Sequence, residues 1–313
     1  MDNNLWQISI CHRFSLEGRS NMDFAQFLQF LITGLTVGSI YALLAIGFVT
    51  IYNTTGILNF AQGEFAMIGA MSCISLIGFG LPMFAAIPIA ILFTAFIGLF
   101  IERTLIKPAR KSAPVTLVVI TIGLSIFLKG LGLIIWGTYP KTLSPIVQIK
   151  PIHFFGAVIN PQSLFIFAIL IVLLALLYFF FDKTFIGSAL RASETNPRAA
   201  SLMGINTQAM SGLSFTLAAA LGAIAGIIIA PLTDATYEMG FLIGLKGFVA
   251  MVIGGMNNIS GAVMGGLVLG VVEAFSSGLL SSTYSDAISF TVLLLVLFFR
   301  PNGLFGKATG LRV

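Results

Sequence analysis

The sequence has 313 residues, of which 58% are hydrophobic and only 9% are charged. A soluble domain has about a quarter of its residues charged, so this composition excludes a soluble enzyme or binding domain and indicates an all-α, polytopic membrane protein. The net charge of +5 does not indicate a nucleic-acid partner. The basic residues cluster at the ends of apolar runs, where they orient membrane helices.

The first 21 residues differ from the rest of the chain. Arg13, Glu17 and Arg19 interrupt them, and the apolar stretch begins too late for a secretory signal peptide. Met22 stands just before the first apolar run, so we expect residues 1–21 to be a tail or an overcalled start. Residues 22–313 are expected to form one membrane domain.

About 20 apolar residues are needed to span the hydrocarbon core of a bilayer. The chain offers nine candidate runs, at residues 24–51, 64–80, 84–101, 115–136, 162–181, 211–231, 241–256, 260–280 and 286–299. The runs at 241–256 and 286–299 are short, so we expect them to be tilted, re-entrant or broken. The sequence therefore predicts a transmembrane helical bundle of eight or nine spans.

Basic residues gather in three short segments, at 103–111, 183–198 and 300–312. Clusters of Lys and Arg stay in the cytoplasm, and an even number of predicted runs separates each pair of clusters. We therefore expect all three on the cytoplasmic side. The chain then enters its first run from outside the cytoplasm, or from inside if one early run is re-entrant.

Two breaks between apolar runs are rich in side-chain amides and are expected on the cytoplasmic side. Their polar residues are Asn53, Asn59, Gln62, Glu64, Asn257 and Asn258. Amides and the ends of broken helices can hold a zwitterion without a fixed charge. For the first break, a plain loop and the lining of a solute pathway are equally favoured.

Residues 182–210 form a polar, basic segment between two membrane runs. Asn196 is a residue type that caps helix N-termini, and Pro197 suits the first helical turn. The sequence predicts a short helix from Pro197 to Met203 that is ended by Gly204. A rigid helix in a cytoplasmic loop is suited to passing motion to a soluble partner.

Ionisable and small residues mark the late runs. Lys246 and Glu273 lie within predicted spans, where charges are costly and usually face a cavity or a partner. We expect them to form an ion pair that fixes the helix register, or to line the pathway. The patterns Gly261-x-x-x-Gly265 and Gly266-x-x-x-Gly270 bring helix backbones close together, within the chain or at a dimer seam.

Motifs for catalysis and cofactor binding are absent from the sequence. It contains no Gly-x-x-x-x-Gly-Lys-[Ser/Thr] and no Gly-x-Ser-x-Gly. The spacing of His12 and His153 does not suit a shared metal, and Cys11 and Cys73 make neither a disulfide framework nor a metal site. We expect no catalytic residues, no metal and no cofactor.

Residues 38–70, 187–228 and 244–273, with the ending FRPNGLFG at 299–306, resemble the LivH-type permeases of branched-chain amino acid ABC importers. The resemblance covers nearly the whole chain from about residue 24. It implies a multi-pass permease embedded in the lipid of the cell inner membrane. It also implies a second, LivM-like permease subunit, two cytoplasmic ABC ATPases and a periplasmic substrate-binding protein.

The resemblance also assigns a role to the polar segment, because ABC permeases carry a coupling loop with Glu-Ala-Ala and a later Gly. Here Arg198-Ala199-Ala200 and Gly204 keep the small residues and the Gly, and Arg replaces Glu. The implied ATPase-coupling residues are Arg191, Asn196, Pro197, Arg198, Ala199, Ala200 and Gly204. Gln62 stands where the family commonly has His, and Gln does not titrate.

Two transport mechanisms fit these patterns. The first is an ATP-coupled permease for a small neutral or zwitterionic solute, with branched-chain amino acids favoured and urea or short amides as alternatives. Its expected pathway residues are Asn53, Asn59, Gln62, Glu64, Asn257, Asn258 and Glu273. The second is an ion- or proton-coupled secondary carrier, for which Glu273 is the candidate coupling carboxylate.

Overall fold

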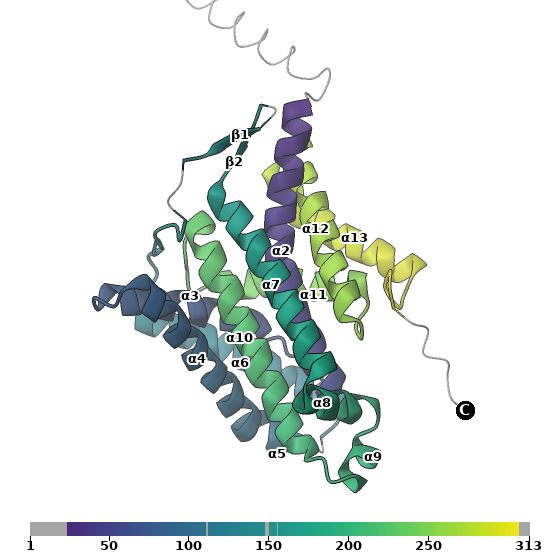
Figure 1. Ribbon diagram of the computed structural model, residues 1–313. Coiled ribbons are helices and arrows are strands. Elements are labelled where there is room, and N and C mark those ends of the chain that lie inside the picture. Colours follow the sequence, from purple (N-terminus) through teal and green to yellow (C-terminus); the bar gives the residue numbers. More distant parts are fainter. Residues whose placement is uncertain (1–23, 111, 148–149, 155, 307–313) are drawn as a thin grey trace, which may run out of the picture.

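The chain is described by a computed structural model that covers residues 24–306, apart from 111, 148–149 and 155. The tail expected at residues 1–21 lies outside this part of the chain. The described residues form a helical bundle with one small β-hairpin (Figure 1). The predicted fold class is therefore confirmed.

Nine of the helices within residues 24–306 match the nine predicted runs. They are α2 (Phe24–Thr55), α3 (Gln62–Gly78), α4 (Met83–Ile101), α6 (Pro114–Trp136), α7 (Pro161–Lys183), α10 (Thr207–Thr233), α11 (Met239–Gly254), α12 (Ile259–Leu279) and α13 (Ser285–Phe299). In the described part, seven segments are long and apolar enough to cross a membrane. The helices α3 and α11 are the shorter members of the bundle.

Shorter elements connect these helices. They are η1 (Glu102–Ile106, a π-helix), α5 (Lys107–Ala109), β1 (Ile152–Phe154), β2 (Ala157–Ile159), α8 (Phe185–Thr195), α9 (Pro197–Leu202) and η2 (Ser282–Tyr284). The helix α9 confirms the short helix predicted in the polar segment. The strands β1 and β2 pair in antiparallel register, and the sequence analysis did not predict this hairpin.

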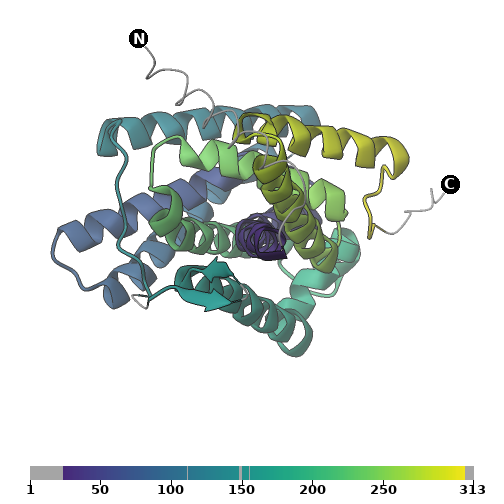
Figure 2. The same ribbon diagram turned by 90° about the horizontal axis from the view of Figure 1, so that it is seen from above.

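The helix α2 stands at the centre of the bundle, and the other helices surround it (Figure 2). Its closest neighbour is α12, which runs in the opposite direction with glycines at the contact. A methyl group on Gly266 would lie 2.5 Å from the Ala42 amide nitrogen, and one on Gly34 would lie 2.6 Å from the Val271 Cα. The glycine patterns of α12 therefore serve packing within the chain.

The two ends of the bundle differ in charge. The β-hairpin lies at one end, beside the start of α2, whereas α5, α8 and α9 lie at the other (Figure 1). At that second end Arg110 and Arg198 line one hollow. The segment after Arg300 binds the last turn of α11 there, because the Leu304 amide donates to the Ile253 carbonyl at 2.8 Å. The described residues of the three basic clusters thus lie at one end, as predicted, whereas Lys111, Lys307 and Arg312 lie outside the described residues.

The first amide break does not lie at that end, contrary to expectation. After α2 the chain folds back into the bundle, and α3 begins where the Gln62 side chain meets the middle of α10 at Ala218. Thr121 of α6 stabilises the break, since its hydroxyl accepts from the Phe60 amide at 3.3 Å and donates to the Leu58 carbonyl at 3.2 Å. Backbone groups at membrane depth require such partners.

We predict that Gly270→Ala lowers the free energy of unfolding by about 1–3 kcal/mol, as overpacking typically does. A side chain at this position would collide with the α2 backbone at Gly38. The measurement is denaturant-induced unfolding of the purified protein in detergent.

The matched control is Gly130→Ala in α6, where a side chain would meet open space. Alanine favours helix more than glycine does, so this variant should be as stable as the parent or slightly more stable. Equal stability of the two variants would contradict the close packing of α2 and α12.

Candidate functional site

The polar segment folds into two helices at the basic end. Helix α8 is amphipathic, and Gly187 allows it to pack closely on the backbone of α7 at Phe180 and Phe181. Leu190 and Ser193 are buried on the same side of α8. The helix therefore lies firmly against the membrane helices, and it joins them to α9.

Helix α9 is capped as the sequence predicts. The Asn196 side-chain oxygen accepts a hydrogen bond from the Ala199 amide at 3.0 Å, and Pro197 occupies the first turn. Gly204 ends the helix with φ of 84°, a conformation that residues with a Cβ adopt poorly. Ala200 is buried beneath the helix. The Asn196 cap and the Gly204 terminus together define a short, rigid helix.

The outer side of α9 is exposed and partly hydrophobic. Leu202 and Met203 are 88% and 84% exposed, and Arg198 is also exposed. Sequence reasoning missed Leu202 and Met203, because single apolar residues in a polar loop give no periodic signal. Large solvent-exposed apolar side chains next to a positive charge are typical of a protein-docking surface.

A hollow of about 670 Å³ lies beside α9. Arg110 and Arg198 line it from two different loops, and Thr54 at the end of α2 also borders it. The first turn of α10 at Thr207 completes the wall. Of the coupling residues inferred from sequence, Pro197 and Arg198 thus border a concave surface that touches the central helix and that also includes Glu194.

The amides of the first break lie in the interior. Asn59, Gln62 and Glu64 are at most 1% exposed. The Gln62 amide nitrogen donates to the Ala218 carbonyl at 2.8 Å, but Asn59 Nδ2, Gln62 Oε1 and Glu64 Oε2 have no hydrogen-bond partner. Unpaired polar atoms in a buried site are costly, and these three lie together near the start of α3.

Glu64 is held between three helices. Ser125 of α6 donates to Glu64 Oε1 at 2.9 Å. The other carboxylate oxygen faces the first turn of α11, where a methyl group on Gly240 would approach it to 2.5 Å. The starts of α3 and α11 therefore meet at Glu64, and Gly63 and Gly240 permit this contact. Half-buried Phe60 contacts Phe248 with tilted rings, whose centroids lie 5.4 Å apart.

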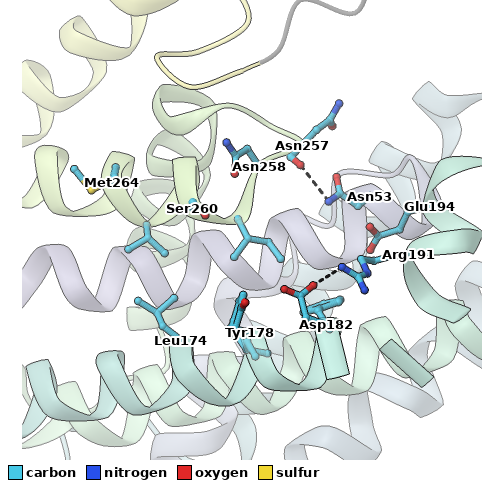
Figure 3. A pocket seen from close by; sticks show the side chains of 14 residues that line it. Asn53, Leu174, Tyr178, Asp182, Arg191, Glu194, Asn257, Asn258, Ser260 and Met264 are labelled. Atoms are coloured by element: carbon cyan, nitrogen blue, oxygen red, sulfur yellow. Dashed lines mark hydrogen bonds and ion pairs between the residues drawn. The ribbon is translucent and has the colours of Figure 1, made fainter. Parts of the chain in front are cut away.

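The second amide break lines a groove of about 610 Å³ between α7 and α12 (Figure 3). Asn53 donates to the Asn257 carbonyl at 3.4 Å, and Asn258 lies on the same rim. Arg191, inferred to be a coupling residue, reaches into this groove and pairs with Asp182. The predicted pathway residues thus fall into separate groups: the groove, the interior cluster at Glu64, and Glu273.

Glu273 belongs to an ionic cluster of four residues. Its carboxylate binds Lys246 at 2.5 Å and accepts from the Tyr41 hydroxyl at 2.8 Å. Lys246 also binds Asp286 of α13 at 2.9 Å. The expected Lys246–Glu273 pair is confirmed, and Asp286 is a partner that the sequence analysis missed. The cluster ties α2, α11, α12 and α13 together.

Comparison with known proteins gives one consistent family. The family described as "Branched-chain amino acid transport system / permease component" matches residues 30–297.

Individual relatives match over most of both chains. The branched-chain amino acid permease BraD of Pseudomonas aeruginosa is 35% identical over 90% of this chain and 96% of its own. LivH of Salmonella typhimurium is 35% identical over 91% of this chain and 97% of its own. A probable LivH of Methanocaldococcus jannaschii is 32% identical over 86% and 89%.

We predict an asymmetric response of the ionic cluster to mutation. Lys246→Met leaves the partly buried Glu273 carboxylate without a cation and should lower the free energy of unfolding by about 3 kcal/mol. Glu273→Gln should lower the free energy of unfolding by about 1 kcal/mol, because Lys246 still pairs with Asp286. Combining both changes should recover most of the Lys246→Met loss. Denaturant unfolding of the three variants provides the measurement, and simple additivity would argue against a coupled cluster.

Proposed function

The chain belongs to the family of permease components of branched-chain amino acid transport systems, and we propose that it forms half of the membrane conduit of an ATP-driven importer. It is a multi-pass protein of the inner membrane. As a permease of an ABC transporter, it works with separate ATPase and substrate-binding subunits. The observation that supports ATP coupling most strongly is the capped helix α9 at the basic end.

The proposed coupling runs from α9 into the bundle. An ATPase that binds the exposed side of α9 moves this helix as a rigid unit, because Asn196 caps its start and Gly204 ends it. Helix α8 passes this motion on, because it packs on α7 through Gly187. Closely packed helices move as rigid bodies between discrete arrangements. We assign residues 182–210 as the coupling loop of a single permease domain, residues 22–313.

The proposed solute is a branched-chain amino acid, as the names of the relatives indicate. The interior cluster has the matching chemistry. Gln62 Oε1 and Glu64 Oε2 are acceptors suited to an ammonium group, and Asn59 Nδ2 is a donor suited to a carboxylate. In the arrangement seen here these atoms are closed off from solvent, so transport requires a second arrangement in which the starts of α3 and α11 separate.

We place the second, LivM-like permease against the edge formed by α6 and α13. These two helices lie along one edge of the bundle in Figure 2. In α13 only 11% of the membrane window is buried, against 78% in the central α2. Ser125 and Thr121 of α6 bind the first break, so this edge stands next to the proposed solute path.

The alternative of a secondary carrier has less support. A coupling carboxylate must exchange its ion or proton during transport, but Glu273 is neutralised by Lys246 and also bound by Tyr41. The decisive experiment is reconstitution of the complete complex in proteoliposomes. ATP-dependent leucine uptake without an ion gradient is expected. Uptake by this chain alone, driven by a sodium or proton gradient, would contradict the proposal.

We predict that Gly204→Glu weakens association with the ATPase, since the side chain strains the left-handed turn and adds a negative charge beside Arg198. Membrane insertion should remain normal. The measurement is co-purification of the ATPase with the permease. Gly204→Asn is the control, because Asn tolerates this backbone conformation, and it should retain the complex. Normal co-purification and uptake with Gly204→Glu would remove α9 from the coupling role.

We also predict that Asn59→Leu reduces the rate of leucine uptake by roughly tenfold, the effect of one hydrogen bond to a charged group, and leaves assembly intact. Gln162→Leu is the matched control. It changes another buried amide, which donates to the Ile228 carbonyl away from the proposed path, and it should leave uptake near the parent rate. Equal uptake by both variants would exclude Asn59 from the pathway.

A further inference from the structure

The groove in Figure 3 has an apolar part and a polar end. Leu174 of α7 lies across the apolar part from Met264 of α12, and Leu177 and Val263 also line it. From Leu174 to Asp182 the helix rises by about 12 Å at 1.5 Å per residue. This length is close to the inner half of a hydrocarbon core of about 30 Å. The apolar part therefore spans one leaflet on the basic side of the protein.

The polar end lies at the depth of the lipid headgroups. Helix α8, which supplies Arg191 and Glu194, is amphipathic. Its first residues, Phe185 and Ile186, are 86% and 50% exposed. Exposed apolar residues on an amphipathic helix beside a membrane span are typical of a helix that lies in the interface.

Among the described residues at the polar end, acidic side chains outnumber basic ones. Asp182 and Glu194 share the single cationic side chain of Arg191, which pairs with Asp182. The Arg191 side chain remains 46% exposed, and a guanidinium has five donors, so it can also bind an anion. Figure 3 shows the Glu194 carboxylate close to Arg191 at the mouth of the groove.

In the described part of the chain, Arg191 is the one cationic side chain that lines the groove with Glu194, whereas Arg110 and Arg198 line the neighbouring hollow that Glu194 also borders. Burial raises the pKa of the Glu194 carboxyl to about 7, although the nearby Arg191 and Thr54 act in the opposite direction. A second cation at this position would stabilise the carboxylate. The groove therefore offers an anion contact at Arg191, a cation contact at Glu194 and an apolar channel leading away from both.

We propose that this groove binds one aminophospholipid of the inner leaflet. The phosphate accepts hydrogen bonds from Arg191, the primary ammonium donates to Glu194 and Asp182, and one acyl chain lies between Leu174 and Met264. Phosphatidylglycerol lacks the ammonium group. Phosphatidylcholine has a quaternary ammonium that cannot donate hydrogen bonds. An apolar helix of a partner subunit would leave the three charged side chains without matching groups.

The test is native mass spectrometry of the assembled transporter, released from nanodiscs with equal amounts of phosphatidylethanolamine, phosphatidylcholine and phosphatidylglycerol. One phosphatidylethanolamine is expected to stay bound to each copy of this chain. Glu194→Gln removes the charged acceptor and should reduce this occupancy by about tenfold, the effect of a lost charged hydrogen bond. Glu238→Gln, at an exposed residue of the opposite half, should leave it unchanged.

A second pair of variants tests the apolar part. Met264→Trp fills the groove and should abolish retention of the bound lipid, whereas Leu176→Trp changes an exposed residue of α7 outside the groove and should not. Equal retention of the three lipids, or equal occupancy in Glu194→Gln and the parent, would overturn the proposal. So would a disulfide from Met264→Cys to the second permease, because that subunit would then occupy the groove.

Discussion

Contact between helix backbones at glycine is the constraint on which the rest of this structure depends. In a bilayer the helices gain little from the hydrophobic effect, so close packing holds them together. Gly266 and Gly270 bring α12 against α2, and Gly226 brings α10 against α3 at Ala66. Helices in such contact have no side-chain layer to absorb small shifts. The pairs α2–α12 and α3–α10 are therefore expected to move as units, which makes the bundle suitable for transmitting motion from α9.

The same packing allows a polar break inside the bundle. Gly63 and Gly240 let the first turns of α3 and α11 touch, and this contact encloses Glu64. Helix N-termini stabilise nearby negative charge, which lowers the cost of a buried carboxylate. The unpaired atoms on Asn59 and Gln62 still cost free energy in this arrangement. A zwitterionic solute that satisfied them would favour a different arrangement, as transport requires.

The membrane helices and α9 follow from local signals. Apolar runs of sufficient length predict α2, α7 and α10, and Asn196 with Gly204 predicts the bounds of α9. The interior position of Asn59 could not be predicted, because it depends on Thr121, a distant residue of α6. For the same reason the sequence did not reveal the groove, which is assembled from several elements. An isolated charge such as Asp286 also gave no indication of its partner.

The central claim is that α9 faces the cytoplasm, where an ATPase can reach it, and it is tested most directly by thiol labelling. In a background with Cys11 and Cys73 replaced by Ser, cysteines are introduced at exposed Ser201 of α9 and at exposed Val158 of the hairpin. A membrane-impermeant maleimide is then applied to right-side-out vesicles before and after permeabilisation. Val158→Cys is expected to label at once and Ser201→Cys only after permeabilisation. Labelling of Ser201→Cys in sealed vesicles would contradict the account.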